Sequence, residues 1–451
     1  MKYSGFKSLV LAIGLFCIIT ICSFPSISGQ NIRTSGQKIE NITGHWEGSF
    51  KDERFTIPFS IDILKNGNSY IAFYNSDAQR ALHIPLQNFI RNNDNIHFEL
   101  IGDKDKLIFD GKIDHNSFSG QIKKGIQKVS FKLFKKVQVR KNYKTSEVTF
   151  QNGDVILSGT LYLPFSNHKN PALLFMHGSG GEQRYTSAYM ADFFASKGIA
   201  VLIYDKRGTG KSTGNWSNSS FKDLANDAIS GIKLLQENPH IDPNKIGIYG
   251  HSQGGAICPL VLTMYPSTAY GISAASAGVS MAESDWYELQ NRFKEFVSGV
   301  DYTNAMTVME KYLHYALTHQ GYDELMAVSR KFEKEKWYQD YIGAIDTATS
   351  FFRTYPKIGS YNPVDYWKTV KQNVLILKGA NDLTCPGYPS FQNVENALKK
   401  AGNNRYKIVI FPNTTHEMHL VGTPNDFSFT GTPGYCDTIL SWIKKTEKVS
   451  I

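Results

Sequence analysis

The first part of the chain alternates between apolar and polar positions with a period of two. Six short runs show this alternation, at residues 56–64, 69–74, 95–100, 106–113, 117–122 and 128–133. Turn residues such as Asn66-Gly67-Asn68 separate them, and Trp46 lies before the first run. Half-buried runs with regular turns are typical of an antiparallel β meander. We therefore predict an all-β domain over residues 30–140, a small barrel or sandwich, and find no catalytic constellation in it.

From residue 141 onwards, short buried runs alternate with helical segments. A predicted hairpin at 148–163 precedes apolar runs at 172–176, 200–204, 245–249, 271–275, 373–377 and 406–411. Helical patterns are found at 187–196, 221–237, 254–264, 388–401 and 433–445. Ser220 is well placed to cap the second of these helices. This alternation is typical of a parallel sheet covered on both faces, so we predict an α/β domain over residues 141–451.

Residues 281–360 interrupt the alternation with a stretch that contains no clear strand. Apolar and aromatic residues recur there at helical spacing, as at Trp286, Leu289, Phe293 and Phe296. An insertion at this point of an α/β sheet lies over the carboxyl ends of the strands, where ligands bind. We expect a helical cap over the active site, and a helical decoration elsewhere is the alternative.

The first 29 residues have the three-part pattern of a secretory signal peptide. Lys2 and Lys7 form a short basic region, an apolar stretch covers residues 9–22, and small residues precede Gln30. The apolar stretch is short for a membrane span, although an uncleaved anchor is the alternative. We expect a secreted or periplasmic protein with no stable membrane insertion after cleavage.

Charge and cysteine content argue against several classes of protein. The formal net charge of +9 is spread along the chain without a basic run, which does not indicate a nucleic-acid-binding protein. Beyond the leader only Cys258, Cys385 and Cys436 remain, too few for a disulfide framework, and any pairing among them stays open. The sequence has no Cys/His cluster of the kind that binds zinc, so we expect no metal and no cofactor.

Residues 250–254 read GHSQG, which matches the motif G-x-S-x-G with Ser252 at its centre. The motif follows a buried run and precedes a glycine-rich helix start. This is the context of a nucleophile elbow, a tight strand-to-helix turn that exposes the serine hydroxyl. We therefore predict that Ser252 is a catalytic nucleophile.

A nucleophilic serine needs a base, and the base needs a carboxylate that orients it. In a fold of this kind the chain order is serine, acid, histidine. Asp382 lies in the turn after the buried run 374–377, and His416 lies in the loop after the run 408–411. We predict Asp382 as the acid and His416 as the base that activates Ser252.

Other histidines and acids in the sequence are alternatives for these roles. His419 is an alternative base, while His251 is expected to pack behind the nucleophile and Asp365 precedes the strand that it would have to follow.

The segment 204–212 resembles a phosphate-binding loop, but Asp205 holds the position that needs glycine. We expect that loop to brace the floor of the active site.

The oxyanion of an acyl-transfer intermediate needs two hydrogen-bond donors. The backbone N–H of Gln253, directly after the nucleophile, is the first. The second is expected from the glycine-rich loop 177–181, with Ser179 preferred and Gly178 as alternative.

Several motifs together resemble a known family. They are HGSG at 177–180, DKRGTGKS at 205–212, GHSQGG at 250–255, GAND at 379–382, and His416. With them, residues 145–451 resemble the α/β-hydrolase superfamily, and in particular bacterial EstD-type esterases near the serine aminopeptidase and acylaminoacyl-peptidase-like hydrolases. The resemblance implies an N-terminal β domain, the roles given above for Ser252, Asp382 and His416, and hydrolysis of short-chain carboxylic esters.

The sequence leads to three hypotheses for the function of the protein. The first is a serine esterase that acts on a small-molecule ester through an acyl-enzyme. The second is an aminopeptidase, which needs an acidic pocket for the substrate amine, and Glu283, Asp285 or Glu288 in the predicted cap are candidates for it. The third is a binding protein on an inactive hydrolase scaffold, which an intact set of catalytic residues disfavours.

Overall fold

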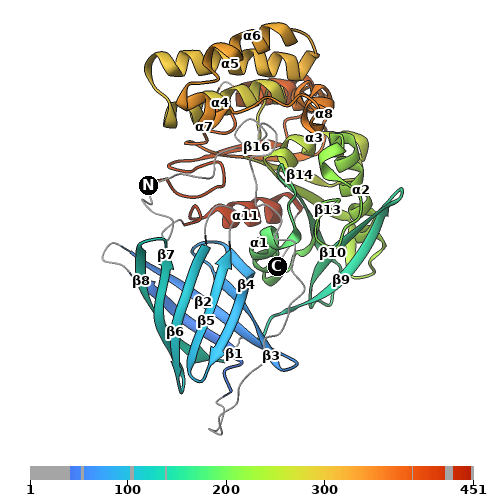
Figure 1. Cartoon of the computed structure of the whole chain (residues 1–451). Coiled ribbons are helices and arrows are strands. Elements are labelled where there is room, and N and C mark those ends of the chain that lie inside the picture. Colours follow the sequence, from blue (N-terminus) through green and yellow to red (C-terminus); the bar gives the residue numbers. More distant parts are fainter. Residues whose placement is uncertain are drawn as a thin grey trace.

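The structure is a computed structural model, and it describes residues 41–51, 55–101, 106–137, 140–388, 390–421 and 430–447. The predicted signal peptide, residues 1–29, lies outside them. Figure 1 shows a β-barrel next to a larger α/β body. Among the helices of these ranges, none combines the length and apolar character needed to cross a bilayer.

Eight antiparallel strands form a barrel in chain order, closed by pairing of the last strand with the first. They are β1 (Gly44–Lys51), β2 (Thr56–Asn66), β3 (Ser69–Ser76), β4 (Ala81–Asn92), β5 (Asn95–Ile101), β6 (Lys106–Asp114), β7 (Ser117–Lys124) and β8 (Gln127–Lys136). Alternate side chains fill the interior, and Trp46, Phe98 and Phe118 are fully buried. Burial of one such side chain stabilises the fold by about 1.5–3 kcal/mol. The barrel therefore has a core of its own.

Strand β4 is not among the runs that the alternation predicts. Only Leu86 of its 12 residues is buried, Pro85 lies in its middle, and the pairing register shifts between Gln87 and Ile90. Proline and a register shift both weaken a period-two pattern. Leu82 at its start packs instead against the core of the α/β body. The strand is held by pairing with β3 and β5 and by contacts with both the barrel core and the α/β body.

The second sheet also has eight strands, in the order β16-β15-β14-β13-β11-β12-β10-β9. They are β9 (Tyr143–Asn152), β10 (Val155–Pro164), β11 (Asn170–Met176), β12 (Ala200–Tyr204), β13 (Ile241–His251), β14 (Tyr270–Ala274), β15 (Asn373–Gly379) and β16 (Tyr406–Phe411). The pairs of β10 with β9 and with β12 are antiparallel, and the other neighbours are parallel. This is the mostly parallel sheet that the alternating pattern predicts.

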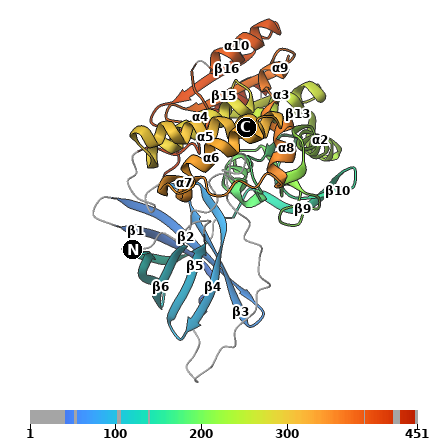
Figure 2. The same ribbon diagram turned by 45° about the horizontal axis from the view of Figure 1, so that its top comes forward.

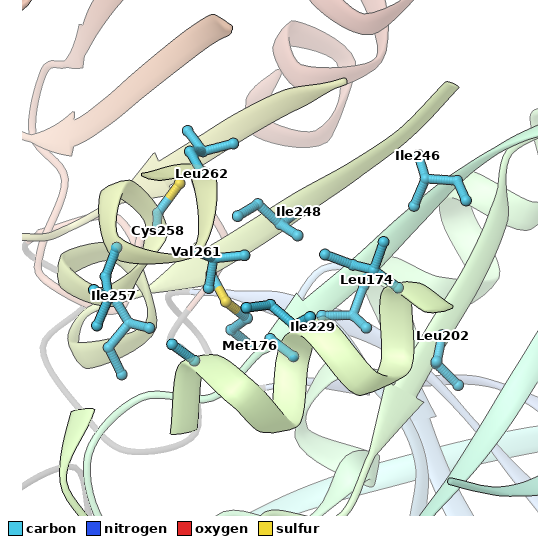
Figure 3. Close-up of a cluster of buried hydrophobic side chains, with 14 of the residues drawn as sticks. Leu174, Met176, Leu202, Ile229, Ile246, Ile248, Ile257, Cys258, Val261 and Leu262 are labelled. Carbon is cyan, nitrogen blue, oxygen red and sulfur yellow. The ribbon is translucent and has the colours of Figure 1, made fainter. Parts of the chain in front are cut away.

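Helices cover both faces of this sheet. They are α1 (Ala188–Ser196) and α11 (Tyr435–Glu447) on one face, and α2 (Phe221–Glu237), α3 (Gln253–Met264), α9 (Pro363–Trp367) and α10 (Ser390–Lys400) on the other. Figure 3 shows the second interface, where Ile229 and Val261 lie near Leu174 and Ile248 of the sheet. Ser220 caps α2 as predicted: its hydroxyl accepts from the N–H of residue 223 in a capping box.

The stretch between β14 and β15 is helical, as predicted. It contains α4 (Met281–Phe296), α5 (Gly299–Thr318), α6 (Tyr322–Phe332), α7 (Lys336–Tyr341) and α8 (Ser350–Gly359). These helices share a separate hydrophobic cluster that includes Leu289, Phe293 and Trp337. In Figure 1 they lie above the sheet, on the side away from the barrel, and Figure 2 turns them toward the viewer.

Candidate active site

Ser252 lies in the turn between strand β13 and helix α3. Its backbone has φ +53° and ψ −114°, a conformation that residues with a Cβ rarely adopt. Its N–H donates to the carbonyl of Ala274 at 2.9 Å, and its carbonyl accepts from the N–H of Ala256 at 3.0 Å. These bonds to a neighbouring strand and to the following helix hold the strained turn that the sequence motif predicts.

Two glycines allow the turn to form. A Cβ on Gly250 would lie 2.2 Å from the carbonyl oxygen of Gly254, and a Cβ on Gly254 would lie 2.7 Å from the carbonyls of both Met176 and His177. Neither position has room for a side chain. The start of α3 therefore lies directly against the end of β11 and the loop that follows it.

His416 connects the other two predicted residues. Its Nε2 lies 3.0 Å from Ser252 Oγ, and its Nδ1 lies 2.9 Å from Asp382 Oδ2. All three side chains are buried. A carboxylate only accepts a hydrogen bond, so Nδ1 carries the proton and Nε2 presents its lone pair to the serine hydroxyl. This arrangement is chemically able to remove the hydroxyl proton of Ser252.

The Asp382 carboxylate receives four hydrogen-bond donors. Oδ1 accepts from the N–H groups of Thr384 (2.9 Å) and Cys385 (2.8 Å), while Oδ2 accepts from His416 and from Lys378 Nζ at 2.7 Å. Burial alone would raise the pKa of Asp382, but His416 and Lys378 together hold it well below the usual value. The carboxylate is therefore negatively charged at neutral pH.

Lys378 was not singled out by the sequence. Its side chain is 1% exposed, and its ammonium group also donates to the carbonyl of Cys385 at 2.7 Å. A lysine inside an otherwise apolar strand, four residues before the predicted acid, is the signal that would have found it, because a buried lysine is rare without a partner.

The alternative histidines and acid occupy other positions. The His251 Nε2–H donates to the carbonyl of His416 at 2.9 Å, so this ring supports the base from behind. Burial lowers the pKa of His251 to about 4 and that of His419 to about 4. Asp365 forms a surface ion pair with Lys368 at 2.7 Å. Within the described ranges, it is His416 that lies at hydrogen-bond distance from the Ser252 hydroxyl.

The loop after β11 lies beside the start of α3, as the oxyanion prediction requires. The N–H of Gly178 donates to the Glu182 carboxylate at 3.1 Å. Lys206 Nζ donates to the Gly178 carbonyl at 2.7 Å and to the side chain of Gln253 at 2.8 Å. This buried lysine therefore ties together the two segments that hold the predicted donors, a role that the sequence did not reveal.

The charged side chains of segment 204–212 form hydrogen bonds and ion pairs with neighbouring parts of the chain. The Asp205 carboxylate accepts from Arg184 and from the backbone of Lys211, and Arg207 forms a buried ion pair with Asp227 at 2.6 Å. The two arginines are thus neutralised by carboxylates. This agrees with the expectation of a loop that braces the site rather than one that binds phosphate.

One group of possible metal ligands coincides with this site. Single donor atoms of Asp382, Cys385 and His416 lie within 4.8 Å of one another. Lys378 already lies against the carboxylate, and a cation in the same place would be repelled by its charge. These residues do not fit a metal ion. Cys258, Cys385 and Cys436 are buried and unpaired.

Comparison with known sequences identifies the family. The profile described as "Serine aminopeptidase, S33" matches residues 167–420. The chain is 24% identical over 265 residues to the uncharacterized peptidase YuxL of Bacillus subtilis (strain 168), covering 56% of this chain and 32% of that protein. It is 33% identical over 110 residues to the quorum-quenching protein AidA of Acinetobacter baumannii (strain MDR-ZJ06), covering 24% and 36%. The chain spans about a third of the length of these curated relatives.

Solved structures with a similar chain path include the esterase Pf2001 of Pyrococcus furiosus, with a TM-score of 0.45 and 16% identity over 67% of this chain and 91% of that one. Proline iminopeptidase of Mycobacterium smegmatis has a TM-score of 0.43 and 16% identity, over 67% and 99%. The family profile covers more than half of the 451 residues. The chain therefore belongs to the S33 serine aminopeptidase family and has the α/β-hydrolase fold.

Proposed function

We propose that the protein is a serine esterase that hydrolyses carboxylic esters with short acyl chains. The observation that carries the proposal is the His416 ring, which reaches Ser252 with one nitrogen and Asp382 with the other. A serine hydroxyl is a weak nucleophile unless a base takes its proton. The resemblance of the motifs to EstD-type esterases supports the ester class.

In the proposed reaction, Ser252 Oγ attacks the ester carbonyl while His416 Nε2 takes its proton. The tetrahedral intermediate collapses, and His416 returns the proton to the alcohol that leaves. Water, activated by the same imidazole, then hydrolyses the acyl-enzyme. Asp382 holds the ring orientation and stabilises the imidazolium that forms in each half-reaction. The chain's own side chains supply every proton transfer.

We assign the oxyanion hole to the backbone N–H groups of Gln253 and Ser179. Gly178 is the weaker alternative, because its N–H already donates to Glu182. The N–H of Ser179 has no acceptor in the described part of the chain, which leaves it free for the substrate oxygen. Lys206 supports this geometry by bonding to both segments.

We propose that helices α4–α8 act as a cap over the active site. Tyr287 of α4 donates its hydroxyl to the carbonyl of Asp382 at 3.2 Å, and Asn291 donates to the carbonyl of Leu383 at 3.0 Å. These bonds support a cap that contacts the loop holding the catalytic acid. A cap also shields the acyl-enzyme from bulk solvent.

We also propose that residues 1–29 are a cleaved signal peptide, that residues 30–140 and 141–451 are separate domains, and that the mature protein is periplasmic or secreted. The leader composition supports this location. The mass of the protein purified from the exported fraction tests it, because retention of the leader would contradict cleavage.

A second candidate function is an aminopeptidase. It is favoured by Glu288 on α4, whose pKa is raised by burial and is affected by the charges of Arg292, His416 and Asp382. An acidic group whose charge interacts with His416 and Asp382 suits a substrate ammonium. Arg292 already pairs with Glu288 at 2.7 Å, so that charge is partly neutralised and the esterase remains the first proposal.

The test is turnover of p-nitrophenyl esters, from acetate to palmitate, by the mature protein and by Ser252→Ala. We expect cleavage of the short esters and a loss on the order of 10³-fold or more in kcat for the variant. Ser267→Ala, at an exposed serine, is the matched control and should keep the activity.

The other outcomes distinguish the alternatives. Retained activity in Ser252→Ala would refute the assignment of the nucleophile. Labelling of Ser252 by a fluorophosphonate without ester turnover, together with cleavage of aminoacyl amides, would favour the aminopeptidase. Absence of both labelling and turnover would favour a binding protein.

A further inference from the structure

The barrel contacts the α/β body through the turn between β3 and β4. Arg80 in this turn donates from Nη1 to the carbonyl of Met418 at 3.1 Å and from Nη2 to the carbonyl of Thr432 at 2.6 Å. Its guanidinium also lies over the ring of Tyr435, 4.7 Å from the centroid. One side chain of the barrel thus contacts three residues that follow β16 in the chain.

Met418 lies two residues after His416, in a loop that needs external support. Asn413 and Met418 have φ values of +49° and +59°, a left-handed conformation that residues with a Cβ rarely adopt. The Met418 carbonyl accepts from Arg80 and also from the N–H of Thr432 at 2.9 Å. The position of His416 therefore depends on bonds made just beyond it.

The turn that presents Arg80 is itself fixed by the barrel. The N–H of Arg80 donates to the carbonyl of Asp77 at 3.2 Å, and the buried hydroxyl of Tyr74 donates to the side chain of Gln79 at 2.6 Å. Tyr74 is 3% exposed inside the barrel. The barrel therefore fixes the backbone from which the Arg80 side chain extends to the loop that contains Met418.

The α/β body has space for the Arg80 guanidinium because residue 431 is a glycine. The N–H of Gly431 donates to the carbonyl of Ala78 at 2.8 Å, and a Cβ on Gly431 would lie 2.3 Å from Arg80 Nε. The hydroxyl groups of Tyr435 and Tyr249 are 2.8 Å apart, and Tyr249 lies three residues before Ser252 on β13. The contact therefore adjoins the segments of both the nucleophile and the base.

We propose that Arg80 is a positioning residue for His416, so that the N-terminal barrel is part of the catalytic apparatus. This inference rests on the proposed function, in which His416 is the base. Arg80 touches no reacting atom. It fixes the loop 412–420, and through it the 3.0 Å approach of His416 Nε2 to Ser252 Oγ.

The test compares Arg80→Met and Arg80→Lys with Arg91→Met in the full chain. Arg91 is the matched control, because its guanidinium also donates to a backbone carbonyl and lies near a tyrosine ring, but only within the barrel. With p-nitrophenyl acetate we expect Arg80→Met to lower kcat about 10- to 100-fold with little change in KM, since small misplacements of a catalytic group have effects of this size. Arg80→Lys, which keeps a charged donor, should lose less, and Arg91→Met should change kcat less than about twofold.

Hydrogen exchange gives a readout that does not depend on turnover. We expect faster exchange in peptides covering residues 412–421 and 430–435 of Arg80→Met, with wild-type exchange in β2 and β6 showing that the barrel is folded. Gly431→Ala displaces the guanidinium from the opposite side and should reproduce both effects, so the test does not depend on a change within the barrel.

The inference is overturned if Arg80→Met keeps the wild-type kcat and the wild-type exchange of residues 412–421. It is also overturned if Arg91→Met lowers kcat as much as Arg80→Met does. A wild-type protein that cleaves no ester would instead refute the proposed function, and the exchange rates would still decide whether Arg80 holds the loop.

Discussion

At the scale of single residues, the candidate site differs from a minimal Ser-His-Asp arrangement by the presence of Lys378. The carboxylate of Asp382 accepts from His416 and from Lys378 on the same oxygen. A carboxylate that is paired with a buried cation stabilises a neighbouring imidazolium less than an unpaired one does. Lys378 therefore favours the neutral form of His416, which is the form that acts as a base.

We predict that Lys378→Met moves the acidic limb of the kcat/KM profile to higher pH. Without the ammonium group, the full charge of Asp382 stabilises protonated His416, so the base is lost at a higher pH than in the wild type. The expected displacement is about one pH unit. Profiles measured between pH 4 and 9 with a short p-nitrophenyl ester check it.

The control for this prediction is Lys399→Met, which removes a lysine of α10 that pairs with Glu395 on the surface at 3.0 Å. Its profile should match that of the wild type. An unchanged acidic limb in Lys378→Met, or one displaced to lower pH, would contradict the electrostatic role of Lys378.

At the scale of elements, the turn that holds Ser252 depends on contacts between α3 and β11. Gly254 lies against the carbonyls of Met176 and His177, which lead into the loop that carries Ser179. The distance between the two proposed oxyanion donors is set by this packing. A change at Gly254 therefore affects catalysis without touching any of the three proposed catalytic side chains.

We predict that Gly254→Ala lowers kcat on a short ester by about 10²- to 10³-fold, because the added methyl group separates α3 from the loop and disrupts the oxyanion site. Gly387→Ala is the matched control, since a Cβ there meets no atom within 4 Å. Steady-state kinetics and circular dichroism of both variants check it. Wild-type kcat in a folded Gly254→Ala protein would refute the proposed packing requirement.

The elements also show what the sequence could and could not predict. Helix α2 was predicted with its bounds and its Ser220 cap, and strand β16 with its bounds, because each follows from local periodicity or capping. The sequence does not predict strand β4, because Pro85 and the shifts in its pairing register interrupt the alternation. The motifs indicate Ser252, Asp382 and His416. The sequence does not indicate Lys378, Lys206 and Arg80, because they reach the site or the segments that hold it only when the chain is folded.

At the scale of the whole molecule, three buried histidines make the fold sensitive to acid. Burial lowers the pKa of His177 to about 3, that of His251 to about 4 and that of His419 to about 4. In the unfolded chain each returns to a pKa of about 6.5. Between these values the unfolded chain binds more protons than the folded one, so the free energy of unfolding falls as the pH decreases from about 7 to about 4.

We predict that His177→Gln reduces this pH dependence. The His177 Nε2–H donates to the carbonyl of Tyr204, and a glutamine amide keeps a donor there without titrating. One such histidine contributes about 2 kcal/mol to the loss of stability between pH 7 and pH 5. Urea unfolding at both pH values checks it, with His168→Gln, at an exposed histidine, as the control. An equal loss in wild type and His177→Gln would contradict it.

The spacing of the three proposed catalytic residues has a consequence for biosynthesis. His416 follows Ser252 by 164 residues, and the helices α4–α8 are synthesised between them. Until β15 and β16 emerge and join the sheet, the newly made chain has neither the carboxylate nor the imidazole beside its serine. Under the proposed mechanism, a nascent or truncated polypeptide therefore contains an unactivated hydroxyl, and the order of synthesis itself delays activity until β16 and the loop that carries His416 have been made.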